Sequence, residues 1–200
     1  LVIFDDWQGF LVHPFAYLVS GSGFIWYGGL IGGFLSITLY LRQQGIRWLL
    51  AVDAISPALA IGHAIGRIGC QISGDGDWGK PTLLPWGMSY PEAVIGWSQW
   101  LRENGLPPDV RVHPAPVYET ILYSGIFLVL WSLRDRGLRA GSLLWLYLLL
   151  SSVARFLVEI IRVEPVIAGG LTQAQWFAIV LSIASLAMLA SSARRTGEPA

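Results

Sequence analysis

Apolar residues gather in five long stretches of this 200-residue chain, at 24–41, 49–68, 115–133, 141–162 and 172–191. About 20 mostly apolar residues are needed for an α-helix to cross the hydrocarbon core of a bilayer. The first and last stretches contain no charged residue, whereas 49–68 and 141–162 each contain several. The pattern predicts an all-α, polytopic integral membrane bundle of about five transmembrane helices, forming a single domain over residues 1–200.

The composition supports a membrane protein. Hydrophobic residues make up 54 % of the chain and charged residues 13 %, and the mean hydropathy is +0.56, which is more apolar than soluble globular chains usually are. The formal net charge is zero, so nothing in it indicates a nucleic-acid partner. Cys70 is the single cysteine, which excludes an internal disulfide framework and a cysteine-rich metal site.

Basic residues in the short connections predict the orientation. They occur between the first two stretches, between the third and fourth, and after the last one: Arg42, Arg47, Arg134, Arg136, Arg139, Arg194 and Arg195. By the positive-inside rule this side is cytoplasmic. The Trp-rich connection 70–114 then lies outside, and its segment 91–104 is predicted to form a short helix in the membrane interface. The alternative is that this connection forms a small soluble cap.

Three ionisable residues recur at helical spacing within the fourth stretch. Arg155, Glu159 and Arg162 are spaced i, i+4 and i+7, which places them on one face of a helix. Inserting a charged side chain into a membrane costs free energy, so such residues tend to face a polar interior and to have partners. Guanidinium groups bind phosphate oxygens well, so one interpretation is a cationic, phosphate-binding cleft with a built-in acid. The alternative is a structural Arg155–Glu159 ion pair with Arg162 reaching to the outer surface.

A second polar group lies in HAIGRIGCQISGDGDWGKPT, residues 63–82. Here a span runs into a glycine-rich segment containing Asp75 and Asp77, and irregular backbone at membrane depth is tolerated only inside protein or beside water. Glycine spacing alone would favour a tight turn, but the intramembrane Arg67 favours a site. His63 is interpreted as an ordinary polar contact. Since the three histidines show no metal-type spacing, no metal is predicted.

Two further segments allow both a structural and a functional interpretation. In VHPAPVYET, residues 112–120, His113 is an ordinary loop residue, and Glu119 would be favoured near a helix N-terminus by the helix dipole. Tyr118 lies beside it in the first turns of the span. In FIWYGGLIGG, residues 24–33, Tyr27 is most simply an interfacial anchor, although its phenol could also meet a lipid headgroup or a nucleophile.

Together these segments resemble the bacterial prolipoprotein diacylglyceryl transferase family. The resemblance runs in order through WYGGLIGG at 26–33, the segment 53–82, HPAPVYE at 113–119, RFLVEIIRVEP at 155–165 and GLTQAQ at 170–175. It implies an inner-membrane enzyme, with its active site toward the outer leaflet and no metal or organic cofactor. Such an enzyme transfers the diacylglyceryl group of phosphatidylglycerol to the lipobox cysteine of a prolipoprotein signal peptide and releases glycerol phosphate.

The resemblance also implies roles for individual residues. Arg67 and Arg155 would bind the headgroup phosphate, Glu159 would orient Arg155, and Tyr27 would stand at the family's catalytic base. A larger set would contribute to substrate binding: Cys70, Asp75, Gly79, His113, Tyr118, Glu119 and Arg162. The partners so implied are phosphatidylglycerol, the prolipoprotein and membrane lipids.

Several positions depart from the family pattern. Tyr27 stands where the family usually has histidine, Cys70 where it has asparagine, and Asp75 where it has glutamate, with one extra residue before Gly79. The thiol-activating base could therefore be Tyr27, His63 or the substrate itself. The first 20 residues contain no basic n-region, so no cleavable signal peptide is predicted, and an upstream helix is expected to be missing. The alternatives are a related enzyme with another lipid donor or acceptor, a lipid or anion transporter, and a non-catalytic homologue.

Overall fold

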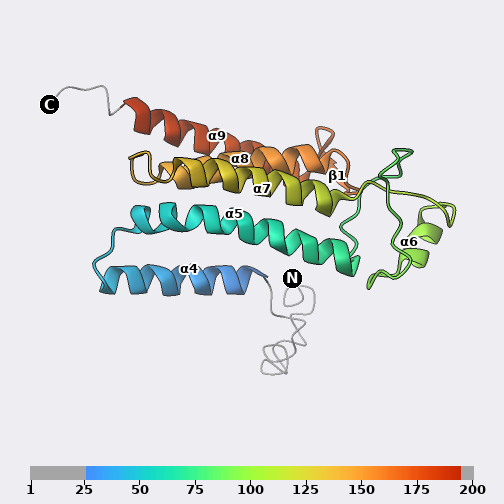
Figure 1. Ribbon diagram of the computed structural model, residues 1–200. Helices are drawn as coiled ribbons and strands as arrows, with labels where there is room; N and C mark the ends of the chain where they lie inside the picture. Colours follow the sequence, from blue (N-terminus) through green and yellow to red (C-terminus); the bar gives the residue numbers. More distant parts are fainter. Residues whose placement is uncertain (1–25, 195–200) are drawn as a thin grey trace, which may run out of the picture. The chain divides into compact units, whose positions relative to one another are not determined.

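The computed structural model describes residues 26–194, which are predominantly helical (Figure 1). The elements in chain order are α4 (Trp26–Gln43), α5 (Trp48–Ser73), α6 (Trp97–Glu103), α7 (Ala115–Leu133), α8 (Ser142–Glu159), β1 (Val166–Ala168), β2 (Leu171–Thr172) and α9 (Gln173–Arg194). The chain divides by its contacts into two compact units, Leu1–Ala51 and Val52–Ala200. A single domain over residues 1–200 stays a prediction.

Four helices of the described part are long and apolar enough to cross a membrane, and they confirm the predicted all-α membrane fold. These are α5, α7, α8 and residues Gln173–Ser191 of α9. Predicted as the first span, α4 does form a helix of 18 residues, but it is not among the four. The polar residues Arg42 and Gln43 at its end lower its mean hydropathy.

Helix α5 is longer than the predicted span 49–68. It runs for 26 residues, or roughly 39 Å at 1.5 Å per residue, which exceeds a hydrocarbon core of about 30 Å. Gly66 and Gly69 therefore lie within a regular helix, and the left-handed backbone begins only at Gly74 (φ 62°) and Gly76 (φ 93°). The irregular backbone predicted for the glycine-rich part of residues 63–82 is therefore confined to the residues that follow α5.

A buried carboxylate links α5 to the start of α8. Asp53 accepts hydrogen bonds from the backbone N–H groups of Gly141 (2.6 Å) and Leu144 (2.8 Å). Gly141 is the N-cap residue of α8 and has no side chain of its own for capping. Because the first N–H groups of a helix have no partner within it, Asp53 supplies the cap from another helix, which accounts for one charge inside a predicted span.

The core of the Val52–Ala200 unit lies where α5, α7 and α8 meet. Its buried residues are Ala60, Ala64, Tyr123, Ile126, Leu130, Leu143 and Ala154. Ala60 and Ala64 are the contribution of α5 to this core, and the Thr120 hydroxyl of α7 donates to the Ala64 carbonyl of α5 across 3.4 Å. Helices α8 and α9 also pack on each other. This packing brings together the ends of α5, α7 and α8, where the polar residues lie.

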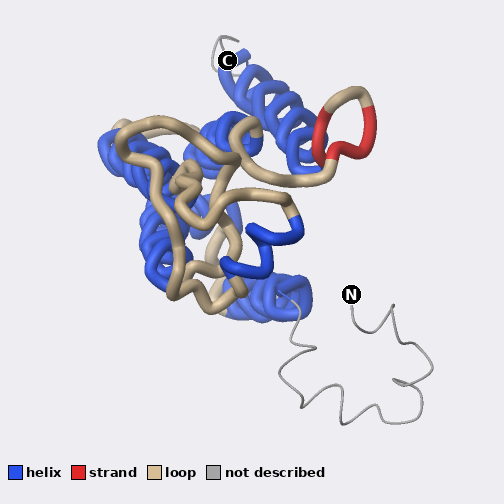
Figure 2. Tube along the Cα trace, turned by 90° about the vertical axis from the view of Figure 1, so that its right-hand side faces the viewer, coloured by secondary structure: helices blue, strands red, loops and turns tan. Residues whose placement is uncertain are grey.

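The 70–114 connection has a small core of its own. Trp78, Tyr90, Trp97, Leu101 and Val112 are buried against one another, and the indole of Trp78 lies 5.0 Å from that of Trp97 between ring centroids. Figure 2 shows the loops around the seven-residue α6 and, separately, the hairpin of β1 and β2 beside the start of α9. Since α6 buries its apolar residues in this core, the packing fits a compact cap better than a helix lying in the interface. The position of the connection relative to the membrane stays a prediction.

Candidate active site

Glu119 is the centre of an ion-pair network between three helices. It lies in the second turn of α7 and its side chain is only 2 % exposed. One carboxylate oxygen pairs with Nε of Arg67 from α5, and the other accepts a hydrogen bond from Nη1 of Arg155 on α8 at 3.1 Å. A buried carboxylate needs such partners. Glu119 therefore does more than complement a helix dipole.

Asp77 forms a second link within the network. Its carboxylate pairs with Nη1 of Arg67 and accepts a hydrogen bond from Nη2 of Arg162 at 2.7 Å. Burial would raise the pKa of Asp77, but its hydrogen bond with Arg162 and the charges of Arg162 and Arg67 outweigh this effect, so the pKa lies below its usual value. Asp77 is thus held as a carboxylate between two guanidinium groups.

Glu159 closes the network at the end of α8. Its Oε2 lies 3.0 Å from Nη2 of Arg155 and 3.8 Å from Nε of Arg162, and its Oε1 accepts a hydrogen bond from the Thr172 hydroxyl at 2.8 Å. Because α8 ends at Glu159, Arg162 does not continue the helical face. Instead its side chain is 8 % exposed and pairs with Asp77 and Glu164. The predicted Arg155–Glu159 ion pair is present, and the alternative of an Arg162 reaching to the surface was wrong.

The four carboxylates of the network outnumber its three guanidiniums. Its three described guanidiniums, on Arg67, Arg155 and Arg162, pair with the carboxylates of Asp77, Glu119, Glu159 and Glu164. The sequence predicted a cationic cleft, and this was wrong because two of the carboxylates come from other segments of the chain. Arg155 is the most accessible of the three arginines, with 30 % of its side chain exposed against 18 % for Arg67 and 8 % for Arg162.

Gly79 holds the glycine-rich loop against the neighbouring segments. Its N–H donates to the His113 carbonyl (2.8 Å), and the next N–H, of Lys80, donates to the Ile161 carbonyl (2.7 Å). A Cβ atom at position 79 would lie 2.7 Å from the Ile161 oxygen and 2.8 Å from His113 Cβ. Only glycine allows this close approach, which fixes the loop carrying Asp77 beside the ends of α7 and α8.

Comparison with known proteins decides the family. Residues 2–191 match the family described as prolipoprotein diacylglyceryl transferase. The chain belongs to this family. Proteins named phosphatidylglycerol–prolipoprotein diacylglyceryl transferase are 32 % identical in Bordetella avium (94 % of this chain, 68 % of the relative), 33 % in Gloeobacter violaceus (85 % and 62 %) and 33 % in Methylococcus capsulatus (97 % and 71 %). The chain thus spans between about three fifths and seven tenths of their length.

Membership of this family confirms the predicted resemblance and the predicted enzyme class. Of the residues that the resemblance singled out, Arg67, Arg155, Glu159, Glu119 and Arg162 meet in the network. Their individual roles stay predictions. Tyr27 lies in the first turn of α4, in the Leu1–Ala51 unit, and its side chain lies outside the described residues.

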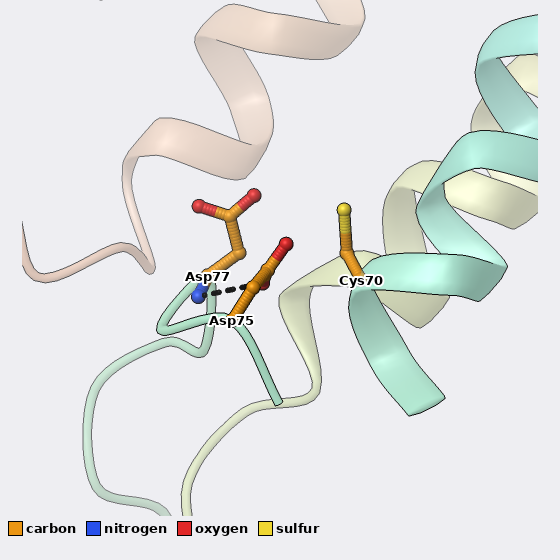
Figure 3. Close-up of side chains that lie close together, drawn as sticks. All are labelled: Cys70, Asp75 and Asp77. Carbon is orange, nitrogen blue, oxygen red and sulfur yellow. Dashed lines mark hydrogen bonds between the residues drawn. The ribbon is translucent and has the colours of Figure 1, made fainter. Parts of the chain in front are cut away.

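Two further members of the set, Cys70 and Asp75, lie close to the network (Figure 3). Nη1 of Arg67 is 3.7 Å from the Cys70 sulfur. Asp75 accepts the Asp77 N–H at 3.3 Å and so shapes the loop. Ligand atoms of Cys70, Asp75 and Asp77 lie within 4.8 Å of one another, but the two guanidiniums on Asp77 disfavour a cation there. The geometry therefore gives no support for a metal centre at this cluster.

His113 and Tyr118 form a hydrogen-bonded group next to Gly79. The phenol oxygen of Tyr118 lies 3.2 Å from Nδ1 of His113 and accepts a hydrogen bond from the indole N–H of Trp86 at 2.8 Å. None of their described contacts reaches the arginines directly. They join the start of α7 to the 70–114 connection.

His63 has more specific surroundings than an ordinary polar contact. Its ring stacks on Tyr123 with centroids 3.7 Å apart, and its Nε2 lies 3.4 Å from Nε of Arg67. The same Nε of Arg67 pairs with Glu119, so His63 and Glu119 lie against one guanidinium. This contact places His63 beside the network without showing that it acts as a base.

Sequence reasoning missed three members of the site, Asp77, Glu164 and Thr172. Asp77 was seen in the glycine-rich segment, but the resemblance favoured Asp75 because one extra residue shifts the register. Thr172 was passed over although Thr172-x-x-Gln175 has the spacing of a capping box before an apolar run. Asp77 and Thr172 carried a signal in the sequence, but that signal described local backbone structure and not contact with the arginines.

Proposed function

We propose that this protein transfers the diacylglyceryl group of phosphatidylglycerol to the lipobox cysteine thiol of a prolipoprotein and releases glycerol phosphate. The family supports this activity. The observation that carries the residue assignment is the bridging of one buried carboxylate, Glu119, by two guanidiniums from separate helices, Arg67 and Arg155.

The reaction moves one negative charge onto the leaving group. The cysteine thiol loses its proton, its sulfur bonds to the glycerol carbon that carries the phosphate ester, and the bond between that carbon and the ester oxygen breaks. The phosphodiester of the lipid thereby becomes a phosphate monoester with an additional negative charge. Preorganised cations near that oxygen stabilise this change.

In this mechanism Arg155 binds the departing phosphate. It is the most accessible arginine of the network, and its two nitrogens Nη1 and Nη2 are held by Glu119 and Glu159. A guanidinium has five N–H donors in a fixed plane, so donors are left for phosphate while the carboxylates fix its orientation. Arg67 supplies a second positive charge, and the buried Arg162 holds the glycine-rich loop through Asp77.

The proton acceptor for the thiol is assigned to one of three candidates, Tyr27, His63 or the substrate phosphate. A free thiol has a pKa near about 8.5 and ionises more readily beside cations. His63, next to Arg67, is the described candidate that lies at the network. Replacing Tyr27 by Phe and His63 by Gln separately would distinguish the three.

The test is transfer of labelled diacylglyceryl from phosphatidylglycerol to a synthetic lipobox peptide by the purified protein in detergent. Arg155→Ala and Arg67→Ala are expected to lower the rate by roughly 100-fold or more, the scale of losing a group that stabilises developing charge. Arg134→Ala is the matched control, because Arg134 pairs with an exposed aspartate and covers the Trp131 ring. Unchanged transfer in both network variants would contradict the assignment.

The same assay separates the proposal from its nearest rival. Phosphatidylethanolamine and cardiolipin are offered in place of phosphatidylglycerol, because Cys70 and Asp75 differ from the usual family residues. Transfer only from one of these lipids would replace the proposed donor. No transfer from any of them by a folded sample would favour a non-catalytic relative.

We also propose that the protein lies in the bacterial inner membrane with the network toward the outer leaflet. The orientation rests on the basic connections at Arg134, Arg136 and Arg139. In a Cys70→Asn background, Asn104→Cys should react with a membrane-impermeant maleimide on intact spheroplasts, and Asp135→Cys should react only after lysis. The reverse pattern would invert the orientation.

A further inference from the structure

Thr172 occupies a junction that the proposed mechanism does not yet use. It ends β2, precedes α9 and is 7 % exposed. Its hydroxyl oxygen accepts the backbone N–H of Gln175 (3.3 Å), and its own N–H donates to Oε1 of Gln175 (3.0 Å). This reciprocal pair is a capping box at the start of α9.

The same hydroxyl also donates to Oε1 of Glu159 at 2.8 Å. The direction of this chain of hydrogen bonds is fixed by chemistry. A backbone N–H can only donate and a carboxylate can only accept, so the single hydroxyl proton of Thr172 points to Glu159. Hydrogen bonds in such a chain strengthen one another and are stronger when the acceptor is charged.

The other oxygen of Glu159 faces the arginines. Oε2 lies 3.0 Å from Nη2 of Arg155, while Oε1 is held by Thr172. Two contacts on opposite oxygens define the plane of a carboxylate, and that plane in turn orients the guanidinium of Arg155. A carboxylate without the Thr172 contact could rotate and release Arg155 from its position.

We propose that Thr172 is a positioning residue for the transferase reaction, holding Glu159 through its hydroxyl so that Arg155 faces the departing phosphate. This inference rests on the proposed function. It adds the start of α9, which follows the β1–β2 hairpin, to the parts of the fold that set the geometry of the site.

A purely structural role predicts a different outcome. If Thr172 only caps α9, its loss should lower thermal stability and leave the kcat of the folded enzyme unchanged. The capping contact and the Glu159 contact can be separated, because Gln175 takes part only in the first. Gln175→Met removes the capping side chain at similar volume and leaves the Thr172–Glu159 hydrogen bond in place.

The experiment compares Thr172→Val, Thr172→Ser and Gln175→Met in the lipobox-peptide assay, with thermal unfolding measured for each. Thr172→Val is expected to lower kcat by roughly 10- to 100-fold, the scale of one hydrogen bond to a charged group, with the KM for phosphatidylglycerol changed less than about threefold. Thr172→Ser keeps the hydroxyl and should restore most of kcat. Gln175→Met should lose stability with little change in kcat.

A double-mutant cycle tests the route through Glu159. If Thr172 acts through that carboxylate, Thr172→Val combined with Glu159→Gln should be no slower than Glu159→Gln alone. If the two substitutions lower kcat by the product of their separate effects, the inference is overturned. It is also overturned if Thr172→Val keeps the full kcat. If Thr172→Val does not fold, Thr172→Ala takes its place in both comparisons. If the unmodified protein transfers nothing, the proposed function fails together with the role of Thr172. If it is active and only the Thr172 predictions fail, the proposed function stands.

Discussion

Glu119 offers the sharpest test of the network, because the change Glu119→Gln removes one charge at nearly constant shape. The carboxylate is 2 % exposed and bridges Arg67 and Arg155. A hydrogen bond to a charged group contributes about 1.5–3 kcal/mol and a neutral one about 0.5–1.5 kcal/mol. The hydrogen bond from Arg155 and the ion pair with Arg67 are both weakened. At about 1–1.5 kcal/mol for each, the expected loss of unfolding free energy is about 2–3 kcal/mol.

Two features keep this estimate below the roughly 3–5 kcal/mol typical of breaking a fully buried ion pair. Arg67 and Arg155 are 18 % and 30 % exposed, so solvent screens part of the interaction. Each also retains another carboxylate, Asp77 for Arg67 and Glu159 for Arg155. For a chain of this length the loss corresponds to a fall in Tm of roughly 4–12 °C.

The assay is unfolding in mixed detergent micelles, followed by the fluorescence of the buried tryptophans. Asp135→Asn is the matched control, because its side chain is 80 % exposed and pairs with Arg134 on the surface. That variant should change the unfolding free energy by less than about 0.5 kcal/mol. A Glu119→Gln protein as stable as this control would refute the reasoning that the network stabilises the helix ends.

Three further outcomes follow from the structure. Asp53→Ala should lower the unfolding free energy by about 1–2 kcal/mol, because α8 loses its cap, and Asp53→Asn by less. Gly79→Ala should cost about 1–3 kcal/mol through overpacking, measured against Gly66→Ala, where a Cβ would meet nothing within 4 Å. Because the pKa of Asp77 is lowered in the folded protein, its stabilisation is present above about pH 4. It is lost as the pH falls through the lower folded value, and Asp77→Asn should abolish this acid-dependent loss.

The long helices could be predicted because each is an apolar run of membrane-spanning length. Their ends could not, since polar residues near an end do not say whether the helix continues. Helix α5 extends past Arg67 to Ser73, whereas α8 stops at Glu159 before Arg162. Helix α5 ends where Gly74 adopts a left-handed backbone (φ 62°). Arg162, beyond the end of α8, pairs with Asp77 and Glu164, and spacing along the chain contains no information on the Asp77 partner.

The sequence predicted several residues of the site correctly, but it did not predict the net charge of the site. The free-energy cost of placing charged side chains within a membrane span was enough to indicate Arg67, Arg155 and Glu159. Their pairing with Glu119 and Asp77 depends on how three helices and a loop meet, which spacing within one helix does not define. Helical periodicity therefore predicted an excess of positive charge where the structure pairs every described guanidinium of the network with carboxylates.

The carboxylates around Arg155 affect catalysis under the proposed function. A group of unpaired guanidiniums would bind the lipid phosphodiester and the released monoester alike, and binding of the ground state does not accelerate the chemical step. Carboxylates such as Glu119 and Glu159 reduce the net attraction for any phosphate while they hold Arg155 in a fixed orientation. The remaining donors of Arg155 then favour the oxygen on which charge develops, because that interaction grows as the carbon–oxygen bond breaks. Orientation, not excess charge, is therefore what the network contributes.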